Sequence, residues 1–253
     1  MIKLVNVNME FNGRTVLRNI NLEIAEGEIM VIIGPSGSGK STLLRLMIGL
    51  LKPTSGEIWI KDQEISRMSE DELNVIRRRM GMVFQYSALF DSMTVGENVA
   101  FGLRQHTNLS DDEISQIVRR KLRMVGLAGH ENDMPGNLSG GMKKRVSLAR
   151  AIAINPEILL YDEPTAGLDP IMAGTIDRLI VSTRRLLKVT SVVVTHDMAS
   201  AFSIADRIAM IYQGEIIEIG TVEQIKASTN PVVQQFIHGW KSPAAFKKRR
   251  PRP

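Results

Sequence analysis

The chain has 253 residues, 43% of them hydrophobic and 23% charged, which is the composition of a globular protein with one large core or two small ones. It contains no cysteine, so disulfides and cysteine-ligated metal sites are excluded. The net charge of +5 is matched by five basic residues in the tail Lys247–Pro253, so the rest of the chain gives no support to a nucleic-acid-binding surface.

Residues 1–87 are predicted to form short strands around one loop that binds phosphate. The β-rich runs lie beside glycines and are Ile2–Val7, Ile20–Ile24, Met30–Ile33, Glu57–Ile60 and Met80–Val83. The third run is followed by a loop that matches G-x-x-x-x-G-K-[ST], and then by an apolar-periodic stretch, Leu43–Leu50. The loop consists of Gly34, Pro35, Ser36, Gly37, Ser38, Gly39, Lys40, Ser41 and Thr42.

The strand before this loop and the helix after it determine its chemistry. Backbone N–H groups of a glycine-rich loop point inward around an anion, and the helix N-terminus adds partial positive charge. Lys40 is expected to reach the β- and γ-phosphates, and the Ser41 hydroxyl is expected to bind Mg²⁺. The pattern therefore predicts a nucleoside triphosphate site.

From about residue 88 to residue 150 the chain is expected to be helical. Capping patterns S-x-x-E at Ser69–Glu72 and Ser110–Glu113 predict helix starts. The second precedes a stripe expected to face a core, made of Ile114, Ile117, Val118, Leu122 and Val125. Leu138–Gly141 then leads into a predicted helix over Lys143–Ile154 and forms a second helix start that can receive an anion.

Residues 151–225 show the alternation of strands and helices that is typical of a parallel sheet. Two apolar runs, Ile158–Tyr161 and Ser191–Thr195, flank a helical segment around Ile176–Leu187. Arg207–Tyr212 and Glu215–Gly220 lie on either side of a Gln-Gly pair and are predicted to form a closing hairpin.

Polar side chains follow both apolar runs directly. Asp162 and Glu163 come after the first run, and His196 comes after the second. An acid at the end of such a strand is suited to hold Mg²⁺ or its water, and the next carboxylate is suited to take a proton from the attacking water. Glu163 could instead cap a helix before Pro164, and a lone histidine is more often structural.

These motifs, in this order, resemble the ATP-binding cassette (ABC) family, whose signature loop reads L-S-G-G, over roughly residues 2–225. The resemblance implies an α/β P-loop NTPase fold, with a RecA-like core containing a parallel sheet, an N-terminal antiparallel β subdomain and an inserted α-helical subdomain. The ATP-binding core is expected over 1–87 and 151–225, the helical subdomain over 88–150, and a C-terminal extension over 226–253.

The resemblance implies that the cofactors are ATP and Mg²⁺. It places ATP against Phe11, Gly34, Pro35, Ser36, Gly37, Ser38, Gly39, Lys40, Ser41, Thr42, Ser139, Gly140, Gly141 and Asp169. It places Mg²⁺ against Ser41, Gln85 and Asp162, and it assigns catalysis to Glu163, His196 and Gln85. Phe11 stands where the family more often has a tyrosine that stacks on adenine, and the alternative is a core phenylalanine beside a turn.

The resemblance also implies partners. In this family the signature loop of one subunit closes over the ATP held by the other, so a second copy of the chain, or a paralogue, is expected to complete the site. Gln85–Phe90, which contains two aromatics and Leu89, is the expected docking segment for an integral membrane permease. These side chains could instead pack the junction between subdomains. No stretch reaches the ~18 uninterrupted apolar residues of a membrane span, so a membrane role would require a partner.

Shorter motifs are similar to the ATPase subunits of Mla-type phospholipid transporters. They are Phe84–Phe90, Arg104–Thr107, Leu138–Met142, Asp169–Ile171 and Phe236–Trp240. Met142 stands where importers of small solutes usually have glutamine, although it could be a packing variant. This resemblance implies phospholipid transport that serves outer-membrane lipid asymmetry, an MCE-domain lipid-binding partner, and a peripheral place on the cytoplasmic side of the inner membrane.

Other functions remain open on the residues alone. The chain could serve a solute importer or exporter with the same chemistry. A cassette acting on DNA or ribosomes is disfavoured by the single module and the neutral body, and no nucleic-acid partner is expected. A simple P-loop kinase or GTPase would leave Gln85 and Leu138–Gly141 unexplained. The basic tail could touch anionic lipid headgroups or act as a solubilising end.

Overall fold

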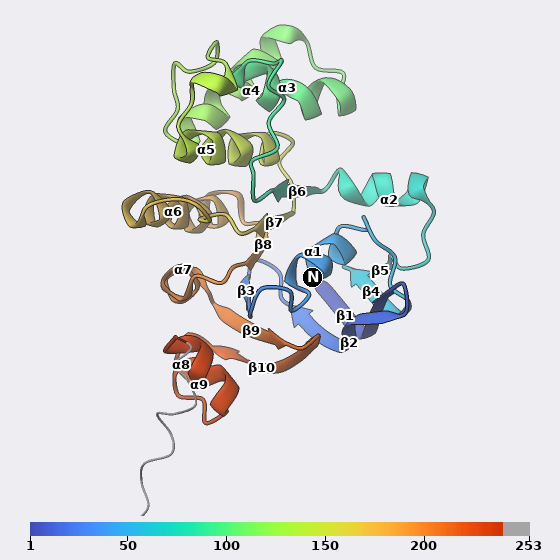
Figure 1. Cartoon of the computed structure of the whole chain (residues 1–253). Helices are drawn as coiled ribbons and strands as arrows, with labels where there is room; N and C mark the ends of the chain where they lie inside the picture. The colour runs from blue at the N-terminus through green and yellow to red at the C-terminus, as the bar shows by residue number, and fades with distance from the viewer. Residues whose placement is uncertain (240–253) are drawn as a thin grey trace, which may run out of the picture.

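An antiparallel sheet forms the N-terminal part of the computed structural model, which describes residues 1–239 (Figure 1). Its strands are β1 (Ile2–Phe11), β2 (Arg14–Ile24), β4 (Ser55–Ile60) and β5 (Gln63–Glu64), in the order β2-β1-β4-β5. The first two strands are longer than predicted. Asn12 and Gly13, with φ of 50° and 76°, make a tight turn, so pairing continues to its base at Phe11 and Arg14.

The second sheet has six strands and is mostly parallel. From edge to edge they are β10 (Glu215–Thr221), β9 (Arg207–Tyr212), β3 (Ile29–Ile33), β8 (Thr190–Val194), β7 (Ile158–Asp162) and β6 (Met80–Val83). Strand β10 alone runs antiparallel, in the predicted hairpin with β9. The predicted α/β P-loop NTPase fold, with its antiparallel subdomain, is confirmed.

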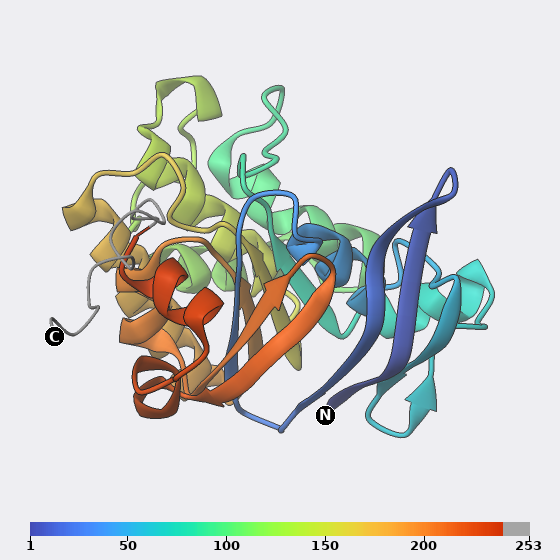
Figure 2. The same ribbon diagram turned by 60° about the horizontal axis from the view of Figure 1, so that its bottom comes forward.

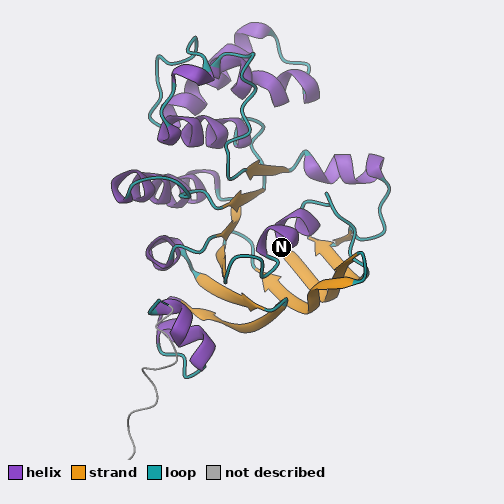
Figure 3. Ribbon diagram, in the orientation of Figure 1, coloured by secondary structure: helices purple, strands orange, loops and turns teal. Residues whose placement is uncertain are grey.

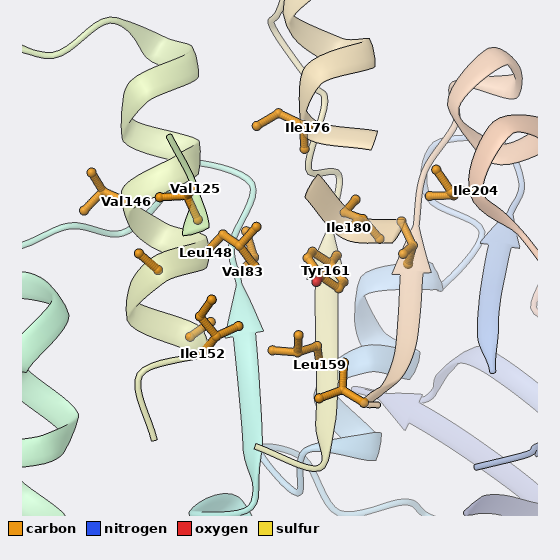
Figure 4. Close-up of a cluster of buried hydrophobic side chains, with 14 of the residues drawn as sticks. Val83, Val125, Val146, Leu148, Ile152, Leu159, Tyr161, Ile176, Ile180 and Ile204 are labelled. Carbon is orange, nitrogen blue, oxygen red and sulfur yellow. The ribbon is translucent and has the colours of Figure 1, made fainter. Parts of the chain in front are cut away.

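Strand β3 is buried on both faces and separates two hydrophobic cores. Ile29, Val31 and Ile33 face one core, while Met30 and Ile32 face the other, as the two-residue repeat of a strand requires. Figure 4 shows part of the first core, in which side chains of β7 lie near those of the helices that cover it: Leu159, Tyr161, Leu148, Ile152, Ile176 and Ile180. The second core contains helix α1 (Lys40–Met47) together with residues of both sheets.

Three helices, α3 (Val95–His106), α4 (Asp111–Met124) and α5 (Gly140–Ala151), gather at one end of the molecule with only loops and a short 3-10 turn, Pro135–Asn137, between them (Figure 3). This arrangement agrees with the expected helical insertion. Helix α1 was predicted to begin at Leu43 and α5 at Lys143, but each starts three residues earlier. Helix α1 begins with three polar residues and α5 with two glycines, which apolar periodicity does not detect.

The capping patterns form as the sequence predicts. Ser69 accepts from the N–H of Glu72 at the start of α2 (Glu70–Arg77), and Ser110 accepts from that of Glu113 at the start of α4, with both reciprocal bonds present. A third box at Thr94–Glu97 begins α3 and was not predicted.

The remaining helices contribute buried side chains to the first core. They are α6 (Pro170–Leu187), α7 (Met198–Ile204), α8 (Val222–Lys226) and α9 (Pro231–Ile237). Figure 2 shows the β9–β10 hairpin beside β2, to which Gly214 is joined through an N–H from Arg18. No helix within residues 1–239 is long and apolar enough to cross a bilayer. Trp240 and the basic tail Lys247–Pro253 lie outside the described residues, and the division at 87, 150 and 225 stays a prediction.

Candidate ATP site

Four neighbouring parallel strands end at one edge of the sheet and bring the predicted residues together. Strand β3 leads into the phosphate loop, β8 into His196, β7 into Asp162 and Glu163, and β6 into Gln85. In open parallel sheets ligands bind at the carboxyl ends of the strands, so this edge is the candidate site. The structure thus brings these segments, which are distant in the sequence, to one edge of the sheet.

The phosphate loop needs glycine at its first position, Gly34, and at Gly39, which precedes the lysine. At Gly34, where φ is 153°, a Cβ would lie 2.1 Å from the carbonyl oxygen of Ile211. At Gly39, where φ is 103°, a Cβ would lie 2.5 Å from a methyl carbon of Leu17. Backbone with positive φ costs little only for glycine, so the loop conformation depends on these two residues.

Buried groups of opposite charge lie beneath the loop. The Lys40 ammonium donates to the carbonyl oxygens of Gly34 and Pro35 at 2.8 and 3.0 Å. Burial lowers the pKa of Lys40, and the carboxylates of Glu163 and Asp162 offset part of this effect. Burial raises the pKa of Asp162, while the hydrogen bond that it accepts from Ser41 opposes the rise.

The donor atoms at Ser41 and Asp162 suit a magnesium ion. The Ser41 hydroxyl oxygen lies 2.9 Å from Oδ1 of Asp162, so a hydroxyl and a carboxylate already face each other. Residues 1–239 contain no cluster of three or more His, Cys, Asp or Glu side chains that could hold a metal ion alone. This set fits Mg²⁺, which usually takes one or two protein oxygens and completes its shell with phosphate and water.

Glu163 and His196 are in direct contact. Nδ1 of His196 lies 2.9 Å from Oε2 of Glu163, whose side chain is largely buried while the imidazole is exposed. The backbone of Glu163 has a φ of 48°, a left-handed conformation that costs roughly 1–3 kcal/mol in a residue other than glycine. A carboxylate held in this way beside the Lys40 ammonium has the geometry of a fixed proton acceptor.

Most of the predicted phosphate-loop residues and all three predicted catalytic residues line a cleft of about 320 Å³, while Gly34, Pro35, Ser38 and Asp162 do not line it. It is lined by Val16, Ser36, Gly37, Gly39, Lys40, Ser41, Thr42, Gln85, Glu163 and His196. A larger cavity of about 970 Å³ lies between α6 and α7, but none of the phosphate-loop residues lines it. The smaller cleft is the better candidate because only it combines backbone donors, a lysine and a carboxylate.

Several predicted ATP contacts lie outside this cleft. Ser139 caps α5, accepting from the N–H of Met142, and Gly141 packs beside α6, where a Cβ would lie 2.4 Å from the methyl carbon of Met172. Asp169 caps α6. Phe11, 41% exposed, lies at the end of β1 and does not line the cleft, whereas Val16 of β2 does. The structure thus separates the signature loop from the phosphate loop of the same chain.

Two basic residues of α5 that were not predicted from the sequence donate hydrogen bonds to the backbone at this edge. Lys144 donates to the backbone carbonyl oxygens of Gln85 and Glu163, and Arg150 donates to those of Ser87 and Ala88. Spacing could have indicated Lys144. It falls three residues after the buried Gly141 and four before the buried Leu148, on the inner face of a helix.

Comparison with known proteins determines the family. Residues 17–166 match the family description "ABC transporter", which is more than half of the chain. The chain belongs to the ABC transporter ATPase family. It is therefore an ATP-hydrolysing enzyme with the fold that the motifs predicted.

Individual relatives agree with this assignment. The intermembrane phospholipid transport system ATP-binding protein MlaF of Haemophilus influenzae is 44% identical, over 98% of this chain and 94% of the relative. A probable ribonucleotide transport ATP-binding protein, mkl, of Mycobacterium leprae is 40% identical, over 94% and 69%. Among solved structures, the dimeric post-hydrolysis state of the ATP-binding cassette MJ0796 with ADP and Pi has a TM-score of 0.81 at 38% identity, over 88% of this chain and 99% of that one.

Proposed function

We propose that two copies of this chain close around two ATP molecules and thereby drive a membrane permease. The observation that carries this proposal is the separation of Ser139–Gly141 from the 320 Å³ cleft. A second helix start suited to phosphate has no phosphate loop to face within its own chain. A second copy, related by a two-fold axis, would supply one, and each cleft would then be completed by its partner.

Within each proposed site, the chain's residues divide the work of hydrolysis. Lys40 and the loop N–H groups hold the phosphates, and Ser41, Asp162 and Gln85 hold Mg²⁺, which would neutralise phosphate charge. Glu163 accepts a proton from the attacking water, and His196 contacts the γ-phosphate. Asp169 belongs to the segment that crosses the dimer interface.

The dependence of ATP turnover on protein concentration tests whether the site is shared between two chains. ATP turnover per chain should rise more than linearly as protein concentration increases, or should require the permease. The variant Glu163→Gln should bind ATP without hydrolysing it and elute as a dimer in size-exclusion chromatography when ATP is present. A dilute monomer with full turnover would overturn the shared-site proposal.

We infer that the permease docks on the segment Gln85–Phe90. Tyr86 is 87% exposed, and Phe84 and Phe90 are exposed on either side of it. Leu89 instead packs against the first core, and Phe90 lies 4.8 Å from the ring of Phe101, so part of the segment also packs the subdomain junction. The variant Tyr86→Ala should therefore reduce permease-dependent turnover while leaving ATP affinity unchanged.

The proposed cargo is phospholipid, with an MCE-domain lipid-binding partner and a peripheral position at the cytoplasmic face of the inner membrane. The support is the MlaF relative, which covers nearly the whole chain. Purification of the tagged chain from its own membranes tests this assignment. Recovery of a permease with an MCE-domain protein is expected, whereas a periplasmic solute-binding protein would favour a solute importer.

A different transported substrate is the second candidate. The relative mkl, which is 40% identical to this chain, is named for ribonucleotide transport. Relatives at about this level of identity are therefore named for more than one substrate. Vesicles containing the purified complex would separate the two candidates, because only one labelled substrate class would move when ATP is added.

A further inference from the structure

Lys144 of α5 is a buried cation without a carboxylate partner. Only 6% of the residue is exposed, and no acidic side chain of residues 1–239 lies within ion-pair distance of it. Its ammonium donates instead to two backbone carbonyl oxygens, those of Gln85 and, at 3.3 Å, Glu163. Burying a charge is costly unless it is compensated, and these two contacts, together with the nearby carboxylate charges of Glu163 and Asp162, offset that cost.

The first of the two segments, at Glu163, is strained. Its left-handed backbone is held by an N–H donated to Val194 at 2.9 Å and by a carbonyl that receives both the Ala166 N–H, at 3.1 Å, and the Lys144 ammonium. Such a conformation persists only where surrounding contacts over-determine it. Within residues 1–239, Lys144 donates the only hydrogen bond from the helical subdomain to the Glu163 backbone.

The second segment, after Gln85, is strained as well. Ser87 and Ala88 have φ of 63° and 47°, and neither is glycine. Arg150, two turns further along α5, donates to both of their carbonyl oxygens at 3.0 and 2.6 Å. Helix α5 therefore donates hydrogen bonds to three carbonyl oxygens of the docking segment and to one of the predicted base.

We propose that Lys144 is a positioning residue that links the backbone of Gln85 to that of Glu163, so that the position of the docking segment controls the position of the base. The inference rests on the proposed role of Glu163. Since α5 also begins with the signature loop, movement of this helix reaches the docking segment and the base together. A misplacement of about 1 Å at a reacting group can cost on the order of 100-fold in rate.

Lys144→Met tests this link, because methionine keeps most of the length and the apolar packing of the side chain but not its donors. Lys121→Met is the matched control. Lys121 is also buried, at 1% exposure, but it donates to the side chain of Asn155, in the loop between α5 and β7. Both variants lose a buried ammonium, so any general loss of stability is common to them.

The first measurement is amide hydrogen exchange in the protein without nucleotide. We expect Lys144→Met to raise exchange roughly tenfold in both segments, 84–90 and 163–168, because each loses a contact that holds strained backbone. Lys121→Met should leave both segments unchanged. Unchanged exchange at 163–168 in a folded Lys144→Met protein would overturn the inference, whether or not Glu163 is the base.

The second measurement is steady-state ATP hydrolysis by the complex with its permease. We expect Lys144→Met to lower kcat by about 10- to 100-fold with KM for ATP unchanged, because the phosphate loop is intact. A parallel rise in KM, or an equal loss in Lys121→Met, would indicate a structural role only. If Lys144→Met does not fold, Lys144→Gln, which keeps a donor with shorter reach, should show the same pattern with smaller effects. Wild-type kcat in that variant would equally overturn the inference.

Discussion

The nucleotide edge of the parallel sheet and the helical end of the molecule are stabilised by different means. At the edge, Lys40 and Asp162 are buried with opposed pKa shifts, and Glu163 has a left-handed backbone. At the helical end, α3 and α4 begin with complete capping boxes and bury apolar stripes. The backbone at the edge is locally unfavourable and must be held by the surrounding fold, whereas the starts and apolar stripes of α3 and α4 follow local rules.

The two regions also bury lysine differently. Lys144 binds backbone carbonyls of two loops, while Lys121 binds the side chain of Asn155 at 2.6 Å. A backbone carbonyl is present whatever the side chain, so substitution cannot remove this partner. A movement of the backbone at one loop therefore also moves the lysine. A side-chain partner on a neighbouring segment mainly fixes packing. The comparison therefore predicts effects on activity at the edge and effects on stability at the helical end.

The largest contrast should appear between Glu163→Gln and Glu131→Gln. The first removes the proposed proton acceptor and should lower kcat by about 10²- to 10⁴-fold with ATP affinity retained. The second removes a carboxylate whose hydrogen bond is to the N–H of Gly129, and should leave both parameters unchanged. Phosphate release and titration with a fluorescent ATP analogue measure them. Full turnover by Glu163→Gln would abolish the contrast.

A smaller contrast is expected between two glycines with positive φ. Gly34→Ala places a Cβ 2.1 Å from backbone oxygen, so the phosphate loop must move and ATP affinity should fall at least about tenfold. Gly129→Ala has nothing within 4 Å, so it should cost about 1 kcal/mol of backbone strain without changing ATP affinity. Urea denaturation and ATP titration separate the two outcomes. Equal ATP affinity in both variants would contradict the steric role of Gly34.

Two serine caps sharpen the comparison further. Ser110→Ala and Ser139→Ala should each lower the free energy of unfolding by about 1 kcal/mol, because each removes the acceptor for a first-turn N–H. Only Ser139→Ala should also reduce ATP turnover, since Ser139 belongs to the signature loop. Thermal unfolding and phosphate release measured on the same samples test this. Equal turnover in the two variants would count against the shared site.

The smallest effect concerns pH. Burial, with a smaller contribution from the Arg120 charge, lowers the pKa of Lys121 to about 8 from 10.5. Between these values the unfolded lysine keeps a proton that the folded one has lost, so raising the pH through this window favours the folded state; below pH 8 both states are protonated.

Lys121→Met should remove this rise. The unfolding free energy of the wild type relative to the variant should increase from about pH 7.5 to about pH 9.5, measured by urea denaturation. Lys3→Met, which removes an exposed lysine of β1, is the control and should show no such trend. A flat difference for Lys121→Met would mean that the buried ammonium keeps its proton.

Sequence rules predicted the parts of the fold that are decided locally. Continuous apolar runs located the parallel strands to within a residue or two, and the S-x-x-E patterns located two helix starts. The P-loop was predictable because the backbone of such a loop requires glycine at fixed positions in any sequence. Residues at the edge could be grouped because parallel strands end together.

Other features depended on tertiary contacts and escaped prediction. Lys144 and Arg150 look like ordinary charges on a basic helix, and only their carbonyl partners, distant in the chain, give them a role. The left-handed backbone at Ser87, Ala88 and Glu163 has no local signal, because none is glycine. Helix α1 began three residues early because its first turn closes the phosphate loop.

Helix α5 donates hydrogen bonds to both the docking segment and the backbone of Glu163, and this double attachment has a thermodynamic consequence. Free-energy coupling between two binding sites is reciprocal. If a partner seated at Gln85–Phe90 changes the affinity for ATP, then ATP must change the affinity for that partner by the same factor. The affinity of the chain for that partner would therefore depend on whether ATP is bound. A pull-down of the partner at several ATP concentrations would measure this coupling without observing transport.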